Sequence, residues 1–221
     1  RSIYPYSGQE KSVVDSWSSE LLEEGRIASV YAEDAIFVAA EDLPVYGTIL
    51  KRERELAEAD RKVLSALDRP KTANELSDLL QTDADKTVRS LHVLETTQVV
   101  GRSSHKGGKW RYGRRELPPI DREKALDKAI ASFVAAFGPA AVEEIAFALW
   151  QEEEAVRKAV SALVAEEVLD EGRFLVSEHP QYMLKLDHLR LRSAGHQVYD
   201  NRSVETYRRS KLNGPFASIE D

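Results

Sequence analysis

The sequence has 221 residues, a formal net charge of -7, and 42% hydrophobic and 31% charged residues. This balance is typical of a folded protein, and no apolar run approaches the ~20 residues that a membrane span requires. There is no cysteine, which excludes disulfides and thiolate metal sites and agrees with a cytoplasmic location. The first residue is Arg1 rather than Met, so we expect the sequence to be a piece of a longer protein.

The first 50 residues predict one helix and one hairpin. The stretch VVDSWSSELLEEG has the spacing of an amphipathic helix that ends at Gly25. The stretches RIASVYA and AIFVAA predict two strands joined around Glu33 and Asp34. We interpret residues 1–50 as the tail of a truncated winged-helix unit, of which only the last helix and the hairpin are present.

Residues 51–118 predict a complete winged helix-turn-helix domain. Apolar residues recur at helical spacing over 54–67, 72–80 and 84–96. Two strands, QVVGR and KWRYGR, follow, and they are joined by SSHKGG, a loop of small and permissive residues. Three helices followed by such a two-stranded hairpin, the wing, are typical of this domain type.

The same pattern returns 69 residues later, over residues 119–178. Leu76 and Leu94, for example, align with Ile145 and Leu163. This second domain predicts a short wing within EVLDEGRFLVS, with its turn formed by Asp170, Glu171 and Gly172. Its helices are predicted over 121–136, 140–149 and 152–166.

Residues 179–221 predict a helical and basic C-terminal appendage, with helices near 181–192 and 203–212. The sequence as a whole therefore predicts a mainly α fold with small β-hairpins (α+β), built from tandem winged helix-turn-helix domains.

Residue types that carry catalysis or bind metals form no recognisable pattern. The five His residues are scattered, and no glycine-rich phosphate loop ends in Lys-Ser/Thr. The triplet Glu152, Glu153 and Glu154 falls in the first turn of a predicted helix, where the helix dipole favours negative charge. We therefore predict no catalytic residue, no metal and no cofactor in this chain.

The wing of the first domain carries the strongest functional signal. Residues 101–115, GRSSHKGGKWRYGRR, hold six Lys/Arg and no acidic residue in a chain that is acidic overall. Cations on a projecting hairpin neutralise phosphates, and the third helix of such a domain lies against the major groove. That helix is predicted to bury Val88, Leu91 and Leu94 and to expose two cations. The predicted nucleic-acid-binding residues are Lys86, Arg89, Arg102, His105, Lys106, Lys109, Arg111, Tyr112, Arg114 and Arg115.

Two aromatic residues of the wing have two interpretations. Trp110 and Tyr112 alternate with Lys109 and Arg111, so both rings lie on one face of the strand. That face either packs on the domain core, which we favour, or offers rings on which an unpaired base stacks. The corresponding helix of the second domain is nearly neutral on its outer face, so we expect it to serve packing or partner contact.

Two segments of the chain resemble the region that follows the motor in large helicase-related (Lhr) proteins, in their archaeal form. The first, within residues 14–50, has a helix ending in LxxxGR and a later AAED. The second, within residues 130–176, has GPxxxEEIAxxL and a later GRF. The matching residues are Leu21, Gly25, Arg26, Ala39, Ala40, Glu41, Asp42, Gly138, Pro139, Glu143, Glu144, Ile145, Ala146, Leu149, Leu163, Gly172, Arg173 and Phe174.

This resemblance implies a nucleic-acid-binding accessory region of a superfamily 2 DNA helicase, with the motor upstream and no chemistry in the chain itself. DNA, single- or double-stranded, is the expected partner. The alternatives are a winged-helix transcription regulator, a protein-interaction scaffold and, least favoured, a DNA glycosylase, because similar segments occur in bacterial DNA glycosylases related to crosslink repair. A glycosylase would need a carboxylate in a pocket.

Overall fold

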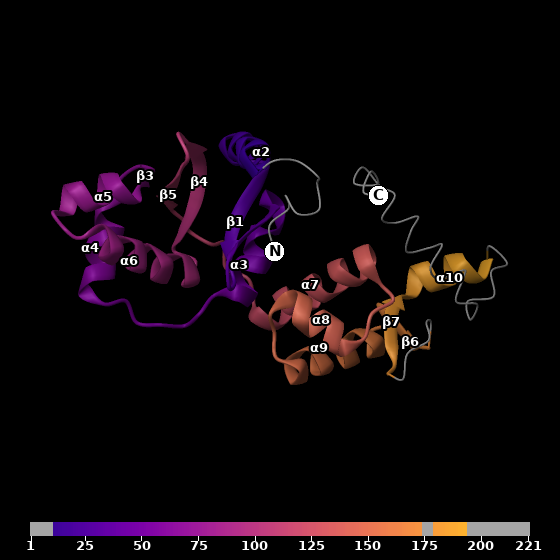
Figure 1. The fold of residues 1–221 in the computed structure, drawn as a ribbon. Helices are drawn as coiled ribbons and strands as arrows, with labels where there is room; N and C mark the ends of the chain where they lie inside the picture. The colour runs from indigo at the N-terminus through magenta and orange to yellow at the C-terminus, as the bar shows by residue number, and fades with distance from the viewer. Residues whose placement is uncertain (1–10, 174–178, 194–221) are drawn as a thin grey trace. The chain divides into compact units, whose positions relative to one another are not determined.

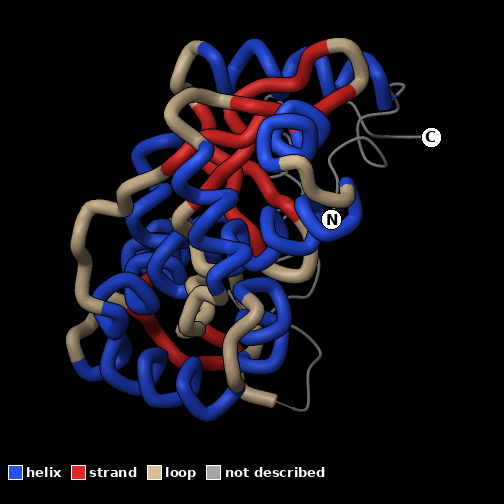
Figure 2. The backbone as a smooth tube through the Cα atoms, turned by 90° about the vertical axis from the view of Figure 1, so that its left-hand side faces the viewer, coloured by secondary structure: helices blue, strands red, loops and turns tan. Residues whose placement is uncertain are grey.

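The computed structural model describes residues 11–173 and 179–193, and the chain divides into two compact units, Arg1–Ile120 and Asp121–Asp221. Both units combine helices with small antiparallel sheets (Figure 1). Figure 2 shows helices as the main component, with the strands as short segments between them. An α+β fold with small hairpins is thus confirmed. Among the described helices, none is both long and apolar enough to cross a membrane.

The first unit begins with a helix and a hairpin, which we call the N-terminal module. It consists of α2 (Lys11–Glu23), β1 (Ile27–Tyr31), β2 (Ala35–Ala39), the 3-10 helix η1 (Ala40–Asp42) and α3 (Leu43–Leu50). β1 and β2 pair antiparallel, with Ile27 opposite Ala39. The predicted helix and hairpin are therefore present, and a further helix, α3, follows them.

The rest of the first unit contains three helices and a three-stranded sheet. The elements are α4 (Glu58–Ala66), β3 (Lys71–Thr72), α5 (Ala73–Leu80), α6 (Ala84–Thr96), β4 (Val100–Lys106) and β5 (Lys109–Arg114). The sheet has the order β3-β5-β4, so that β4 forms one edge. The apolar side chains of this part gather in one buried cluster, formed by Val63, Leu67, Leu76, Leu91, Leu94 and Val100.

Val88 is an exception to the predicted core, because its side chain is 51% exposed. The buried stripe of α6 runs instead through Thr87, Leu91 and Leu94. Val88 lies one residue beyond that stripe, about 100° further round the helix, and so turns outward. The prediction that Val88 is buried is wrong, whereas Leu91 and Leu94 lie in the core as predicted.

The second unit repeats this order, except that a single bridge between Ala140 and Tyr182 stands in the place of β3 and one helix is added at the end. Its elements are α7 (Arg122–Phe137), α8 (Val142–Leu149), α9 (Glu153–Ala165), β6 (Leu169–Gly172), β7 (Gln181–Leu184) and α10 (Lys185–Ser193). Residues 170–172, predicted as a turn, instead belong to β6, which pairs with β7. The helix predicted from 181 begins at Lys185, and the helix predicted over 203–212 lies outside the described residues.

The offset of 69 residues holds in the backbone as well as in the sequence. α8 and α9 have the bounds of α5 and α6 shifted by 69. Left-handed residues recur at the same offset: Gln81 and Trp150 have φ of 50° and 52°, and Gln98 and Glu167 have φ of 58° and 61°. Non-glycine residues adopt this conformation infrequently. The two segments therefore share one backbone plan in detail.

Candidate nucleic-acid interface

The candidate interface is built around the antiparallel ribbon formed by β4 and β5. Its two-residue turn, Gly107-Gly108, has φ of +59° and +74°, values that a type I′ turn requires and that glycine adopts without strain. Lys106 and Lys109 stand opposite each other on either side of the turn.

Arg102 and Arg115 are engaged inside the protein. Nε of Arg102 donates to Oε1 of Glu95 at 3.2 Å, and the two side chains are only 18% and 7% exposed. Arg115 donates to Oε1 of Gln98 at 3.3 Å and to Oγ of Ser29 at 3.2 Å. Burial lowers the pKa of Arg115 to about 10, and burial raises the pKa of Glu95 although Arg102 opposes the shift. The Arg102 guanidinium thus connects the ribbon to α6, and that of Arg115 reaches Ser29 of the N-terminal module.

Arg111 and Arg114 are also engaged within the first unit. Nε and Nη2 of Arg111 both donate to the carbonyl oxygen of Pro70, at 3.2 Å and 2.7 Å, and Nη2 lies 3.5 Å from a carboxylate oxygen of Glu75. Arg114 donates to two carbonyl oxygens in the last turn of α4, at 2.9 Å and 3.1 Å. Cations are favoured at the carboxyl end of a helix. These two arginines therefore attach β5 to the elements that precede it.

The aromatic side chains of the ribbon face other parts of the same unit. The ring of Trp110 lies 4.6 Å from that of His105 and 5.8 Å from that of Phe37, and the guanidinium carbon of Arg102 lies 5.2 Å from its centre. Tyr112 packs against the buried cluster of the first unit, and burial raises the pKa of its hydroxyl. These contacts agree with the interpretation in which this face of the strand packs against the rest of the domain.

Three of the predicted cations extend into solvent. Lys86 and Arg89 lie on the exposed side of α6, and Lys109 lies at the tip of the ribbon. Arg89 donates from Nε to the carbonyl oxygen of Asp85 at 3.3 Å, which leaves its outer nitrogens toward solvent. None of the three forms an ion pair with any side chain that the structure describes. The side chain of Lys106 lies outside those described.

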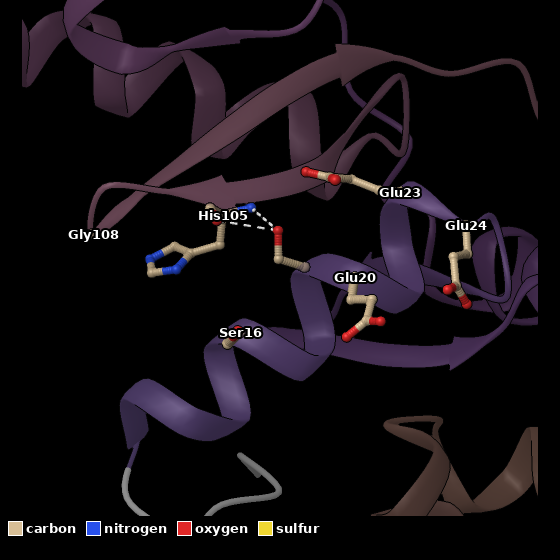
Figure 3. Close-up of a pocket in the computed structure, with 7 residues that line it drawn as sticks. Ser16, Glu20, Glu23, Glu24, His105 and Gly108 are labelled. Carbon is tan, nitrogen blue, oxygen red and sulfur yellow. Dashed lines mark hydrogen bonds between the residues drawn. The ribbon is translucent and has the colours of Figure 1, made fainter.

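A pocket of about 730 Å³ opens between α2 and the tip of the ribbon (Figure 3). It is lined by Ser16, Ser19, Glu20, Glu23, Glu24, His105 and Gly108. The three glutamates all come from the last two turns of α2 or the residue after it. Carboxylates repel phosphates, so this side of the ribbon disfavours a polynucleotide backbone. The pocket was missed from the sequence because its glutamates lie more than 80 residues before His105.

The equivalent helix of the second unit carries cations that are neutralised by nearby acids. Lys158, which corresponds to Arg89 at the offset of 69, has its Nζ 2.8 Å from a carboxylate oxygen of Glu123. Arg157 lies 3.9 Å from Glu143. Arg157 and Lys158 of α9 thus have acidic neighbours, whereas no ion pair to a described side chain engages Lys86 or Arg89 of α6.

Residues 11–198 match the model of the family described as DNA glycosylase AlkZ-like. No curated protein matches the chain. The family match overturns the resemblance to the large helicase-related proteins and, with it, the prediction of a helicase accessory region and an upstream helicase motor. It also contradicts the prediction that the chain performs no chemistry, because glycosylases are enzymes. DNA as the partner agrees with the match.

Proposed function

Because the chain belongs to the AlkZ-like DNA glycosylase family, we propose that it removes a modified base from DNA by hydrolysing the bond between base and deoxyribose. In this reaction water adds to C1′ of the sugar, the base leaves, and an abasic site remains. The match over residues 11–198 is the observation that carries the proposal. A glycosylase turns its target base out of the duplex, so it must hold the DNA backbone firmly on both sides of that base.

We propose that the first unit supplies part of this grip through winged-helix geometry. Three helices and the sheet β3-β5-β4 have the order of elements in a winged helix-turn-helix, in which α6 is the groove-facing helix and the ribbon is the wing. Lys86, Arg89 and Lys109 are the exposed cations that would meet phosphates. The ribbon arginines would act indirectly, by fixing the wing.

The domain assignments are proposals of the same kind. Residues 51–118 and 119–178 would be winged-helix domains, and 179–221 an appendage. The segment 1–50 would be the tail of a third unit, because α2, α6 and α9 end alike. A left-handed residue follows each helix: Gly25, Gln98 or Glu167. Its backbone amide donates to the carbonyl oxygen three residues before it, and the amide of the next residue donates to the carbonyl oxygen five residues before that residue. A cytoplasmic location also stays a prediction.

The test is a base-release assay with the purified chain. Duplex oligonucleotides carrying one alkylated purine, one deaminated base or one oxidised base are incubated with the protein, and abasic sites are revealed by alkaline strand cleavage. We expect cleavage of at least one modified duplex and none of the unmodified duplex. Absence of abasic sites in every duplex would overturn glycosylase activity for this chain.

A further inference from the structure

The edge strand β4 is held by hydroxyl groups of the N-terminal module. An edge strand leaves backbone N–H and C=O groups without strand partners. Oγ of Ser29 accepts from the amide of Arg102 at 2.7 Å and donates to its carbonyl oxygen at 3.4 Å. Oγ of Ser19 accepts from the amide of His105 at 2.8 Å and donates to its carbonyl oxygen at 3.1 Å, as the dashed lines in Figure 3 mark.

A bulge in β4 makes this double attachment possible. Along a regular strand, the backbone N–H and C=O groups of successive residues point to opposite edges. Residues 102 and 105 are three apart, so in a regular strand their N–H and C=O groups would point to opposite edges. The pairing with β5 shifts between Arg102 and Ser104, which leaves Ser103 as the extra residue. With this extra residue, the free backbone groups of Arg102 and His105 face the same side. That side is the one that α2 and β1 occupy in Figure 1.

We propose that Ser19 and Ser29 are positioning residues that fix the direction of the ribbon and thereby the place where its tip meets DNA. His105 is separated from the Gly107-Gly108 turn by a single residue, so the Ser19 attachment lies next to the tip. Both serines are almost fully buried, at 8% and 3% exposure. The inference rests on the proposed DNA-binding role of the ribbon, and it gives the N-terminal module an indirect role in DNA binding.

A positioning role differs measurably from a role in folding. Ser19 borders the open pocket, so water can reach the backbone of His105 once the hydroxyl is removed. The Ser19→Ala variant should therefore stay folded while its ribbon gains freedom. Ser16→Ala is the matched control, because Ser16 lies one turn earlier on α2, lines the same pocket and is exposed.

The experiment combines amide hydrogen exchange with binding of a fluorescein-labelled random-sequence duplex, measured by anisotropy. We expect Ser19→Ala to speed exchange of the His105 amide and Ser29→Ala that of the Arg102 amide. Each should weaken binding about fivefold and lower the salt slope by about one phosphate contact. Ser19→Thr should restore binding, and Ser16→Ala should leave both readouts unchanged.

The outcomes separate this inference from the proposed function. Faster amide exchange with unchanged affinity would show that the attachment exists but positions nothing, and unchanged exchange would show that the serines do not hold the strand. Either result overturns the inference while DNA binding by the parent chain stands. If the parent chain itself fails to bind the duplex, the proposed function is the one that fails.

Discussion

The guanidinium group of Arg115 lies over Gly101, in the space that a Cβ atom at position 101 would occupy. Arg115 follows β5, and Gly101 is the second residue of β4. The missing side chain at 101 therefore lets a buried cation reach Gln98 and Ser29 from across the sheet. A glycine that the sequence shows only as part of a basic stretch is thus a packing requirement of the network around Glu95.

Replacing Gly101 with Ala should destabilise the first unit, because the new methyl group would displace the Arg115 guanidinium. Overpacking of this kind costs about 1–3 kcal/mol of unfolding free energy. Urea unfolding followed by circular dichroism measures the loss. Gly113→Ala is the control, because the nearest atom to a Cβ there is 3.6 Å away, an ordinary contact. Equal stability losses at the two positions would contradict the packing argument.

The carboxyl group of Glu95 should titrate above its ordinary range. Burial is the main cause of its raised pKa, and the charge of Arg102 opposes the shift. Between the pKa of the unfolded chain, near 4.5, and the raised pKa, the folded protein binds the extra proton, so the free energy of unfolding should rise as pH falls through this window. Carboxyl NMR and urea unfolding at several pH values test this, and Glu95→Gln should remove this contribution. A Glu95 pKa at or below 4.5 would contradict the prediction.

Local sequence patterns predicted the helices of the repeat closely. The helix predicted over 84–96 has these bounds in the structure, and Asp83 caps it by accepting from two backbone amides. The pattern failed at 170–172, where Asp-Glu-Gly has the composition of a turn. The partner strand β7 starts at Gln181, nine residues beyond the end of β6, and no local signal announces a pairing at that distance.

The charges of the candidate site were visible in the sequence, but their partners were not. Composition cannot distinguish Lys109, which is exposed, from Arg115, whose partners lie up to 86 residues away. The resemblance to the helicase-related family misled the functional prediction for a related reason. A carboxylate oxygen of Glu144 accepts a hydrogen bond from the amide of Ala141 at 2.8 Å, and Ile145 is fully buried, so the first residue caps the start of α8 and the second packs it. Such residues report a shared fold and not a shared function.

Exposed cations of the first unit should account for much of its affinity for DNA. Replacing Lys86, Arg89 and Lys109 together with Ala should weaken binding of a random duplex at least about tenfold and lower the salt slope by about 2–3. Arg111 is left in place, because its loss would remove the hydrogen bonds to the carbonyl oxygen of Pro70. A change in affinity could then come from a change in folding. Anisotropy titrations at several salt concentrations provide the measurement.

The control variant also removes three positive charges, but at side chains that already have acidic partners. Lys51, Arg61 and Lys62 lie in the same unit, and each pairs with a glutamate within 3.2 Å. Replacing these three with Ala should change affinity much less, because most of their field is already cancelled. If both triple variants lost affinity equally, net charge and not the α6 and ribbon surface would govern binding.

Acidic residues of α2 should weaken binding of DNA beside the ribbon. Glu20, Glu23 and Glu24 border the pocket next to the tip, so their charges face any phosphate placed there. Changing all three to Gln should tighten duplex binding about threefold to tenfold at low salt, and less at about 0.15 M, where screening acts within about 8 Å.

The control changes Glu152, Glu153 and Glu154 of the second unit to Gln, which alters net charge equally. Anisotropy measures both variants. Unchanged affinity would mean that DNA keeps away from this side of the ribbon.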